Sequence, residues 1–286
     1  MDQKSPLNNI AYQFVQELAA DLSGDNLELP GFPDTVLELH RALGDINQSV
    51  KDIVMIINSE PALAARLIRL ANSAAFNTTQ AEVCDPRTAI TQLGFNVVRS
   101  TATEFAMRQL EQQEWLQPVR PQLATIKAES NGVAAICAGI SKNLDGMRAD
   151  EALAAGLFHQ IGNLYLLMQG HKNNLVTDNP DWEDVAGEWH PTIARAIIES
   201  WGMPETVAVA VEHQNVLIET EDDSTALLTK LLGAAKLYHQ LNVGGVEDPQ
   251  KIEKILATTV LIERPFIDLV TIYRDDIDLV RQTMVA

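Results

Sequence analysis

Three of the six histidines lie in segments where an imidazole could bind a metal ion or carry a proton. His159 is followed by Gln160 inside an apolar stretch that two glycines flank. His190 directly precedes a proline, and His213 follows an apolar stretch at 207–211. Because a polar group inside an apolar helix costs free energy unless a partner satisfies it, we expect these side chains to converge on one buried site. Three imidazoles can also hold zinc, so a three-histidine zinc site is an alternative.

The sequence predicts that these histidines lie on helices. The chain is rich in Ala and Leu, aromatic residues make up only 5%, and no segment shows the period-two alternation of a strand. Ser49, Asp85 and Asp248 stand where helix N-caps are expected. Apolar residues recur at helical spacing in a first segment within 1–26 and then at 33–43, 50–57, 59–70, 86–93, 97–115, 123–144, 152–168, 191–201, 204–213, 224–241, 249–262 and 265–284.

Two prolines three residues apart, Pro118 and Pro121, mark the best candidate boundary inside this helical chain. We therefore predict an all-α fold with two helical subdomains joined near residue 120. The predicted division is an N-terminal helix at 1–26, an N-terminal subdomain at 27–121, a second subdomain at 122–240, and C-terminal helices at 241–286 that pack on the second subdomain.

Composition and charge narrow the classes of function. The formal net charge of −18 argues against a nucleic acid or an anionic membrane surface as a partner, because both select basic patches. The two cysteines, Cys84 and Cys137, are far apart in the sequence and have neither disulfide-framework nor zinc-ribbon spacing. No signal peptide and no membrane-spanning run is visible in the sequence. We therefore expect a soluble, cytoplasmic protein.

Several short motifs occur in an order that is typical of one family. In the N-terminal half they are LPGFP at 29–33, SEPALAAR at 59–66, LANS at 70–73 and AITQLG at 89–94. In the C-terminal half they are GLFHQIG at 156–162, the segment from His190 to WGMP at 201–204, and EH at 212–213. With these motifs, over roughly residues 27–240, the chain resembles the HDOD family. These HD-related output domains of bacterial signalling proteins are relatives of the HD metal-dependent phosphohydrolases, and the resemblance implies that the second subdomain is HD-like.

The resemblance also implies a site. HD phosphohydrolases bind metal through a first His, a His-Asp doublet, further His residues and a distal Asp. The matching positions here are Glu129, His159, Gln160, His190, His213 and Lys236. Gln160 offers a neutral amide in place of an anionic ligand, and Lys236, while charged, has no lone pair and repels a divalent ion. The resemblance therefore predicts a degenerate site with no catalytic residue and no metal cofactor, in which the ammonium group of Lys236 stands where the ion would be.

Three interpretations of function follow. The favoured one is a non-catalytic regulatory module of bacterial signal transduction that binds signalling proteins or a small ligand, with a homo-oligomer as a possibility. The alternative is a phosphohydrolase that acts on a phosphoester or nucleotide with a divalent metal at His159, His190 and His213. A third interpretation gives the polar cluster a purely structural role, in which its members hydrogen-bond one another and organise helix packing.

Overall fold

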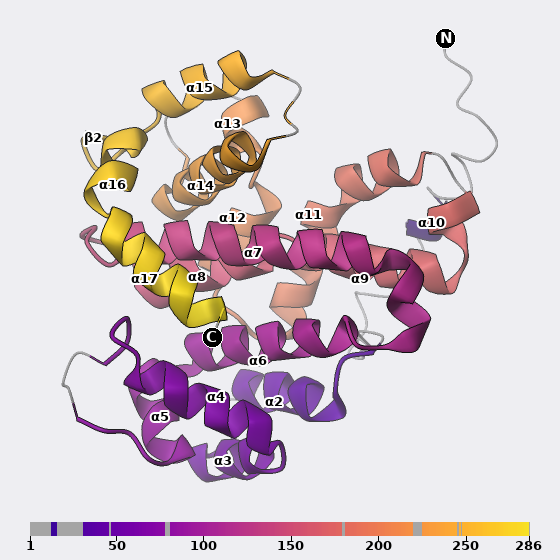
Figure 1. Ribbon diagram of the computed structural model, residues 1–286, viewed down its shortest axis with the longest axis vertical. Coiled ribbons are helices and arrows are strands. Elements are labelled where there is room, and N and C mark those ends of the chain that lie inside the picture. Colours follow the sequence, from indigo (N-terminus) through magenta and orange to yellow (C-terminus); the bar gives the residue numbers. More distant parts are fainter. Residues whose placement is uncertain are drawn as a thin grey trace.

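The computed structural model describes residues 13–15, 31–45, 47–77, 81–178, 181–219, 225–244, 246 and 248–285. Over these residues the protein is built almost wholly from helices, which confirms the predicted all-α class (Figure 1). The exception is a short antiparallel pair of strands, β1 (Val260–Leu261) and β2 (Arg264–Pro265). No helix among the described residues is long and apolar enough to cross a membrane. The predicted helix within 1–26 lies outside the described residues except at 13–15, which are helical.

The N-terminal helices form one group, at the bottom of the view in Figure 1. They are α2 (Asp34–Gly44), α3 (Val50–Asn58), α4 (Pro61–Asn72), α5 (Pro86–Leu93) and α6 (Phe95–Leu110). A 3₁₀ helix, η1 (Glu114–Val119), leads from this group directly into the long helix α7 (Arg120–Ser141).

Helix α7 runs across the middle of the molecule and packs on α8, α14 and α17 (Figure 1). The elements that follow it are α8 (Ala149–Phe158), α9 (Ile161–Lys172), α10 (Leu175–Asp178), α11 (Trp182–Ser200), α12 (Glu205–Glu212), α13 (Val216–Glu219), α14 (Leu227–Val243), α15 (Pro249–Thr258), α16 (Phe266–Ile272) and α17 (Arg274–Val285). Helix α15 packs on α14, and α17 packs along α7 and returns the chain toward the N-terminal helices.

Side-chain caps set several helix starts, as predicted. Ser49 and Asp52 form a reciprocal capping box at the start of α3. Asp85 accepts the backbone N–H of Thr88 at 3.0 Å, and Asp248 does the same for the N–H of Lys251 at 3.0 Å. These contacts satisfy amide groups that have no partner within the helix, so the predicted N-caps are confirmed.

One buried arginine and one stack of aromatic rings join the N-terminal helices to the rest. The ring of His40 on α2 stacks on Trp201 with 3.9 Å between centroids, and its Nε2 lies 2.9 Å from Oγ1 of Thr103. Arg99 on α6 is 3% exposed and donates to the carbonyl of Gly202 at 3.3 Å. Gly202 has a φ of +61°, and a Cβ there would stand 3.0 Å from the backbone of α2, so this close approach requires glycine.

One predicted helix is wrong in an informative way. The segment 152–168 was expected to be continuous but is divided into α8 and α9 at His159 and Gln160. Nδ1 of His159 bonds to the carbonyl of Gly156, which in a continuous helix would accept the amide of Gln160. The break places both polar residues at helix ends, so their side chains can face the interior.

Other predicted boundaries also shift. The helix expected to begin at Pro191 begins at Trp182, and Pro191 lies inside it. The pattern at 249–262 ends as a helix at Thr258 and continues as β1, and the pattern at 265–284 is two helices, α16 and α17. The predicted divisions after 121 and 240 fall inside α7 and α14.

The two cysteines lie in contrasting surroundings. Cys84 is exposed on the segment that precedes α5, whereas Cys137 is buried in α7. Burial raises the pKa of the Cys137 thiol, because the apolar surroundings disfavour the thiolate. Both are free thiols.

Candidate functional site

Four elements of the C-terminal half bring five of the six predicted site residues together. Glu129 comes from α7, His159 and Gln160 from the α8–α9 junction, His190 from the middle of α11, and Lys236 from α14. The positive charge of Lys236 acts on the pKa values of Glu129, His159 and His190 alike, which places it among these side chains. We refer to these five residues as the polar cluster.

His159 is the most completely buried member of the polar cluster, at 1% exposed. Its Nδ1 lies 2.7 Å from the carbonyl oxygen of Gly156. Because a carbonyl can only accept, Nδ1 carries the proton, and Nε2 is a bare acceptor that has no hydrogen-bond partner among the described residues. Burial, and then the charge of Lys236, lower the pKa of His159 to about 3, so the imidazole is neutral at physiological pH.

Gln160 connects the α8–α9 junction to Glu129 of α7. Its Nε2 donates to Oε2 of Glu129 at 2.8 Å, and its Oε1 accepts from Nδ2 of Asn163. Burial raises the pKa of Glu129, while Lys236 and the amide of Gln160 oppose that shift. Both functional atoms of the Gln160 amide therefore make one hydrogen bond each to a protein group.

Lys236 points inward and is 8% exposed. Its Nζ donates to Oε1 of Gln214 at 2.9 Å and to Oδ1 of Asn215 at 2.7 Å. Gln214 is 1% exposed and in turn donates through Nε2 to the backbone carbonyl of His159 at 3.0 Å. The ammonium group is thus built into a buried hydrogen-bond network that reaches the α8–α9 junction.

His190 is brought to the polar cluster by a tight helix crossing. A Cβ on Gly162 of α9 would lie 2.0 Å from the carbonyl oxygen of His190, so α9 and α11 approach at a distance that only glycine permits. Nδ1 of His190 is buried and has no hydrogen-bond partner among the described residues. Burial, followed by the charges of Lys236 and His159, lowers the pKa of His190 well below its ordinary value.

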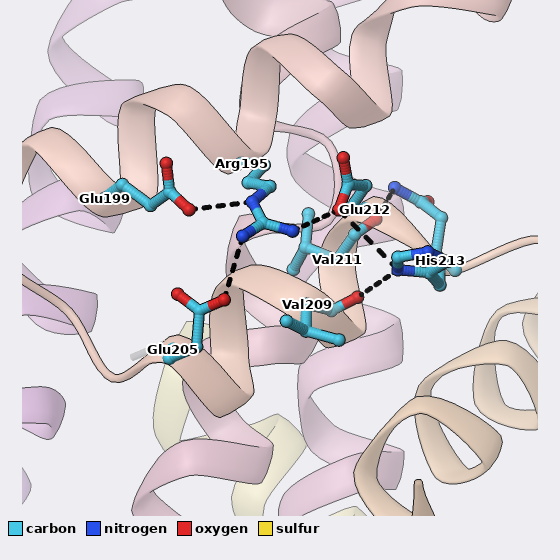
Figure 2. A network of polar contacts seen from close by, with 8 residues as sticks. Arg195, Glu199, Glu205, Val209, Val211, Glu212 and His213 are labelled. Carbon is cyan, nitrogen blue, oxygen red and sulfur yellow. Dashed lines mark hydrogen bonds and ion pairs between the residues drawn. The ribbon is translucent and has the colours of Figure 1, made fainter. Parts of the chain in front are cut away.

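His213 lies apart from the polar cluster. It follows α12, its side chain is 56% exposed, and its Nδ1 lies 3.1 Å from the carbonyl of Val209 (Figure 2). It borders a surface network in which Arg195 pairs with three carboxylates, those of Glu199, Glu205 and Glu212. His159 and His190 therefore lie together in the polar cluster, as expected, whereas His213 lies outside it.

Gln214, Asn215 and Asn163 also belong to the site, and no motif in the sequence predicted them. The first two directly follow His213, and the turn after α12 directs Gln214, rather than His213, toward the interior. The sequence does hold a pattern that could have indicated them. Gln214 and Asn215 follow an apolar segment, and Lys236 lies in another apolar segment where its charge requires polar partners. Asn163 lies three residues after Gln160, which is the spacing of neighbours on a helix face.

The polar cluster presents one carboxylate and two imidazoles as prospective metal ligands, beside the ammonium of Lys236. No group of three or more His, Cys, Asp or Glu side chains in the described ranges is arranged to hold a metal ion. The bare Nε2 of His159, oriented by a bond from Nδ1 to a carbonyl, resembles a metal ligand. However, the ammonium of Lys236 adds positive charge to this site, and the oxygen of Gln160 already accepts a hydrogen bond from Asn163.

Comparison with known proteins identifies the family. Residues 29–217 match the HDOD domain. This match spans more than half of the chain and includes four of the five cluster residues, so the protein belongs to the HDOD family. No match was found among the curated proteins.

Solved structures share the fold over nearly the whole chain. A proposed metal-dependent phosphohydrolase of Shewanella amazonensis SB2B is 22% identical with a TM-score of 0.65, and the alignment covers 96% of this chain and 99% of that one. An HDOD domain protein of unknown function from Geobacter sulfurreducens is 18% identical with a TM-score of 0.57, over 96% and 97% of the two chains. A proposed signal transduction protein of Marinobacter aquaeolei VT8 is 20% identical with a TM-score of 0.52, over 98% of this chain and 67% of that one.

Proposed function

We propose that this protein is a non-catalytic regulatory module of bacterial signal transduction, in which a protonated amine has replaced the metal of an HD-type site. The observation that carries the proposal is the position of Lys236. Its buried Nζ is held by two amide oxygens and acts on the pKa values of Glu129, His159 and His190. The family match and the description of the Marinobacter relative support a signalling role.

The chemistry of the polar cluster favours binding over hydrolysis. A hydrolytic HD site needs anionic ligands that hold the metal and help to generate a hydroxide nucleophile. Here the only carboxylate of the polar cluster, Glu129, accepts a hydrogen bond from Gln160 and is attracted to Lys236. Such an internally neutralised cluster stabilises one arrangement of α7, α9, α11 and α14, and regulation would then act through the surfaces of those helices.

Metal content tests the proposal directly. We expect protein purified without chelator to contain far less than one equivalent of iron, manganese or zinc per chain, measured by elemental analysis. Stoichiometric metal in the wild-type protein would refute the proposal.

Restoring the missing carboxylates gives a sharper test. We expect the double variant Gln160→Asp/Lys236→Asp to bind about one Mn²⁺ per chain and to gain thermal stability when Mn²⁺ is added, because two anionic ligands then join the bare nitrogens of His159 and His190. The matched control, Gln160→Asn/Lys236→Asn, has the same side-chain sizes without the charges and should show neither effect. Equal Mn²⁺ stabilisation of the wild-type protein and of Gln160→Asp/Lys236→Asp would show that the amine does not exclude the metal.

The second candidate is the metal-dependent phosphohydrolase. The bare Nε2 of His159 is the observation that favours it. A panel of phosphodiesters and nucleotides with added Mn²⁺ separates the two candidates. Turnover by the wild-type protein that His159→Ala abolishes would establish the hydrolase, and absence of turnover across the panel is the result that we expect.

A further inference from the structure

A cavity of about 280 Å³ lies away from the polar cluster, between the N-terminal helices and the rest of the molecule. Its walls come from α4, α6, α8 and the end of α17. Figure 1 shows the C-terminal helix α17 descending to the region where α4 and α6 lie. Junctions between folding units are common places for small-molecule sites, and this volume is near the lower limit for such sites.

Most of the cavity wall is apolar. The apolar side chains are Leu70 and Phe76 from α4 and the turn after it, Leu153 and Leu157 from α8, and Leu279 from α17. Of these, Leu153 and Leu157 are 4% and 2% exposed, so they belong to the core and cannot swing out to fill the space. An apolar group that entered the cavity would remove this surface from water, which is favourable.

One side of the cavity is polar and positively charged. Ser100 and Glu104 lie one turn apart on α6, and Arg66 and Arg69 lie one turn apart on α4. Glu104 is 2% exposed and is paired with both Arg66 and Arg108, so its charge is compensated. Within the described ranges no carboxylate pairs with Arg69, which leaves a net positive charge in a protein whose formal charge is −18.

A buried hydroxyl completes the polar side. Ser100 is 3% exposed, it lines the cavity, and its Oγ has no hydrogen-bond partner among the described residues. Leaving such a group unpaired is costly, and a ligand that bonds to it would recover that cost. On the far side of Arg66 and Arg69, a second and more open cavity of about 530 Å³ gives access to the same arginines from solvent.

The end of α17 forms the remaining wall. The backbone carbonyl of Met284 accepts from Nη2 of Arg66 at 2.9 Å and from Nη2 of Arg108 at 3.0 Å. The arginines therefore hold the last turn of α17 over the cavity. A ligand at the arginines would contact the same residues that fix α17, so binding and the position of α17 are coupled.

We propose that this cavity binds a small amphiphilic carboxylate, with its anionic head at Arg69, Arg66 and the hydroxyl of Ser100 and its apolar tail among Leu153, Leu157 and Leu279. This site is separate from the polar cluster, and the proposal does not rest on the absence of a metal there. Positive charge selects the anion, the unpaired hydroxyl donates to it, and the leucines select an apolar tail.

Binding of sodium octanoate to the full chain, followed by calorimetry and thermal shift, tests the proposal. We expect saturable one-to-one binding with a Kd below about 1 mM. Acetate, which has the head alone, and octylamine, which reverses the charge, should each bind at least about tenfold more weakly, because each lacks one of the two contacts.

Four variants locate the site. Arg69→Gln should weaken octanoate binding by roughly fivefold, as the loss of an exposed ion pair predicts, and Arg41→Gln on α2, which lines neither cavity, should leave it unchanged. Ser100→Ala should weaken binding by roughly threefold to tenfold through the lost hydrogen bond. Ser100→Leu should place an apolar side chain where the anionic head would bind and abolish binding.

Two results would overturn the proposal. One is the absence of saturable octanoate binding by the wild-type protein. The other is binding to Ser100→Leu or, if that variant does not fold, to Ser100→Ala and Arg69→Gln, with the wild-type affinity, since the ligand would then occupy another place.

Discussion

At the scale of single residues, two neighbours that are alike in size and polarity have opposite environments. His213 is exposed and borders a surface ion-pair network, whereas Gln214 is buried and bonds to Lys236, to the carbonyl of Val211 and to that of His159. The histidine is the residue that family resemblance assigns to the site. The glutamine is the residue that the fold places there.

This difference predicts contrasting effects of alanine substitution. We expect Gln214→Ala to lower the free energy of unfolding by about 2–4 kcal/mol, because it leaves the ammonium of Lys236 and a buried carbonyl short of partners. His213→Ala should change it by less than about 0.5 kcal/mol, since the side chain is largely in water. Urea denaturation of both variants measures these values, and equal losses would contradict the assignment of Gln214 to the interior.

The sequence predicts members of the polar cluster only where a residue lies in a family motif or stands out from its neighbours. His159, Gln160 and His190 lie in motifs, and Lys236 stands out as a lysine in an apolar helix. The conformation of the turn after α12 decides which of its side chains is buried. A turn has no periodic pattern from which this could be predicted. For that reason the sequence predicts His213 at the site and does not predict Gln214.

At the scale of elements, the approach of α9 to α11 depends on Gly162. We expect Gly162→Ala to destabilise the protein by about 2 kcal/mol or more, because the added Cβ would stand 2.0 Å from a backbone oxygen that cannot move away alone. The matched control is Gly187→Ala on α11, where a Cβ meets nothing within 4 Å. That control should gain up to about 1 kcal/mol, since alanine is the better helix former.

Thermal unfolding of the two variants checks this pair of predictions. The change in thermal stability should have opposite signs in the two variants. A stabilising Gly162→Ala would mean that α9 and α11 are not in close contact, and His190 would then be free to leave the polar cluster.

Helix boundaries were predictable where a side chain caps the helix and not where tertiary contacts decide. Ser49, Asp85 and Asp248 were recognised because their caps are local. The break between α8 and α9 depends instead on a bond from His159 to Gly156, and apolar periodicity continues across it. At α11, the preference of proline for a first turn favoured a start at Pro191, but nine residues before it are also helical.

At the scale of the whole molecule, three neutral histidines are buried, two of them in the polar cluster and one at the contact of the N-terminal helices with the rest. Burial lowers the pKa of His40, at the contact between α2 and Trp201, to about 3, and it lowers those of His159 and His190 as well. In the unfolded chain each imidazole titrates near its ordinary value of 6.5. Their stabilising contribution is therefore present above pH 6.5 and is lost as the pH falls from there toward 3.

We expect the free energy of unfolding to fall steeply on acidification below pH 6.5. Each imidazole that stays neutral in the folded state contributes a loss of about 1.4 kcal/mol per pH unit, because the unfolded state binds a proton that the folded state does not. Urea denaturation between pH 7 and pH 5 measures the slope, and His40→Gln should reduce it. A stability that does not change over this range would show that these histidines are not buried.

The contrast between the two thiols has a practical consequence. Cys84 is exposed on the N-terminal half, and Cys137 is buried with a raised pKa. A maleimide fluorophore should therefore attach to the native wild-type protein at one position without any engineering, because alkylation requires an accessible thiolate. Such a probe on the segment before α5 would report by anisotropy when a candidate partner enlarges the tumbling particle.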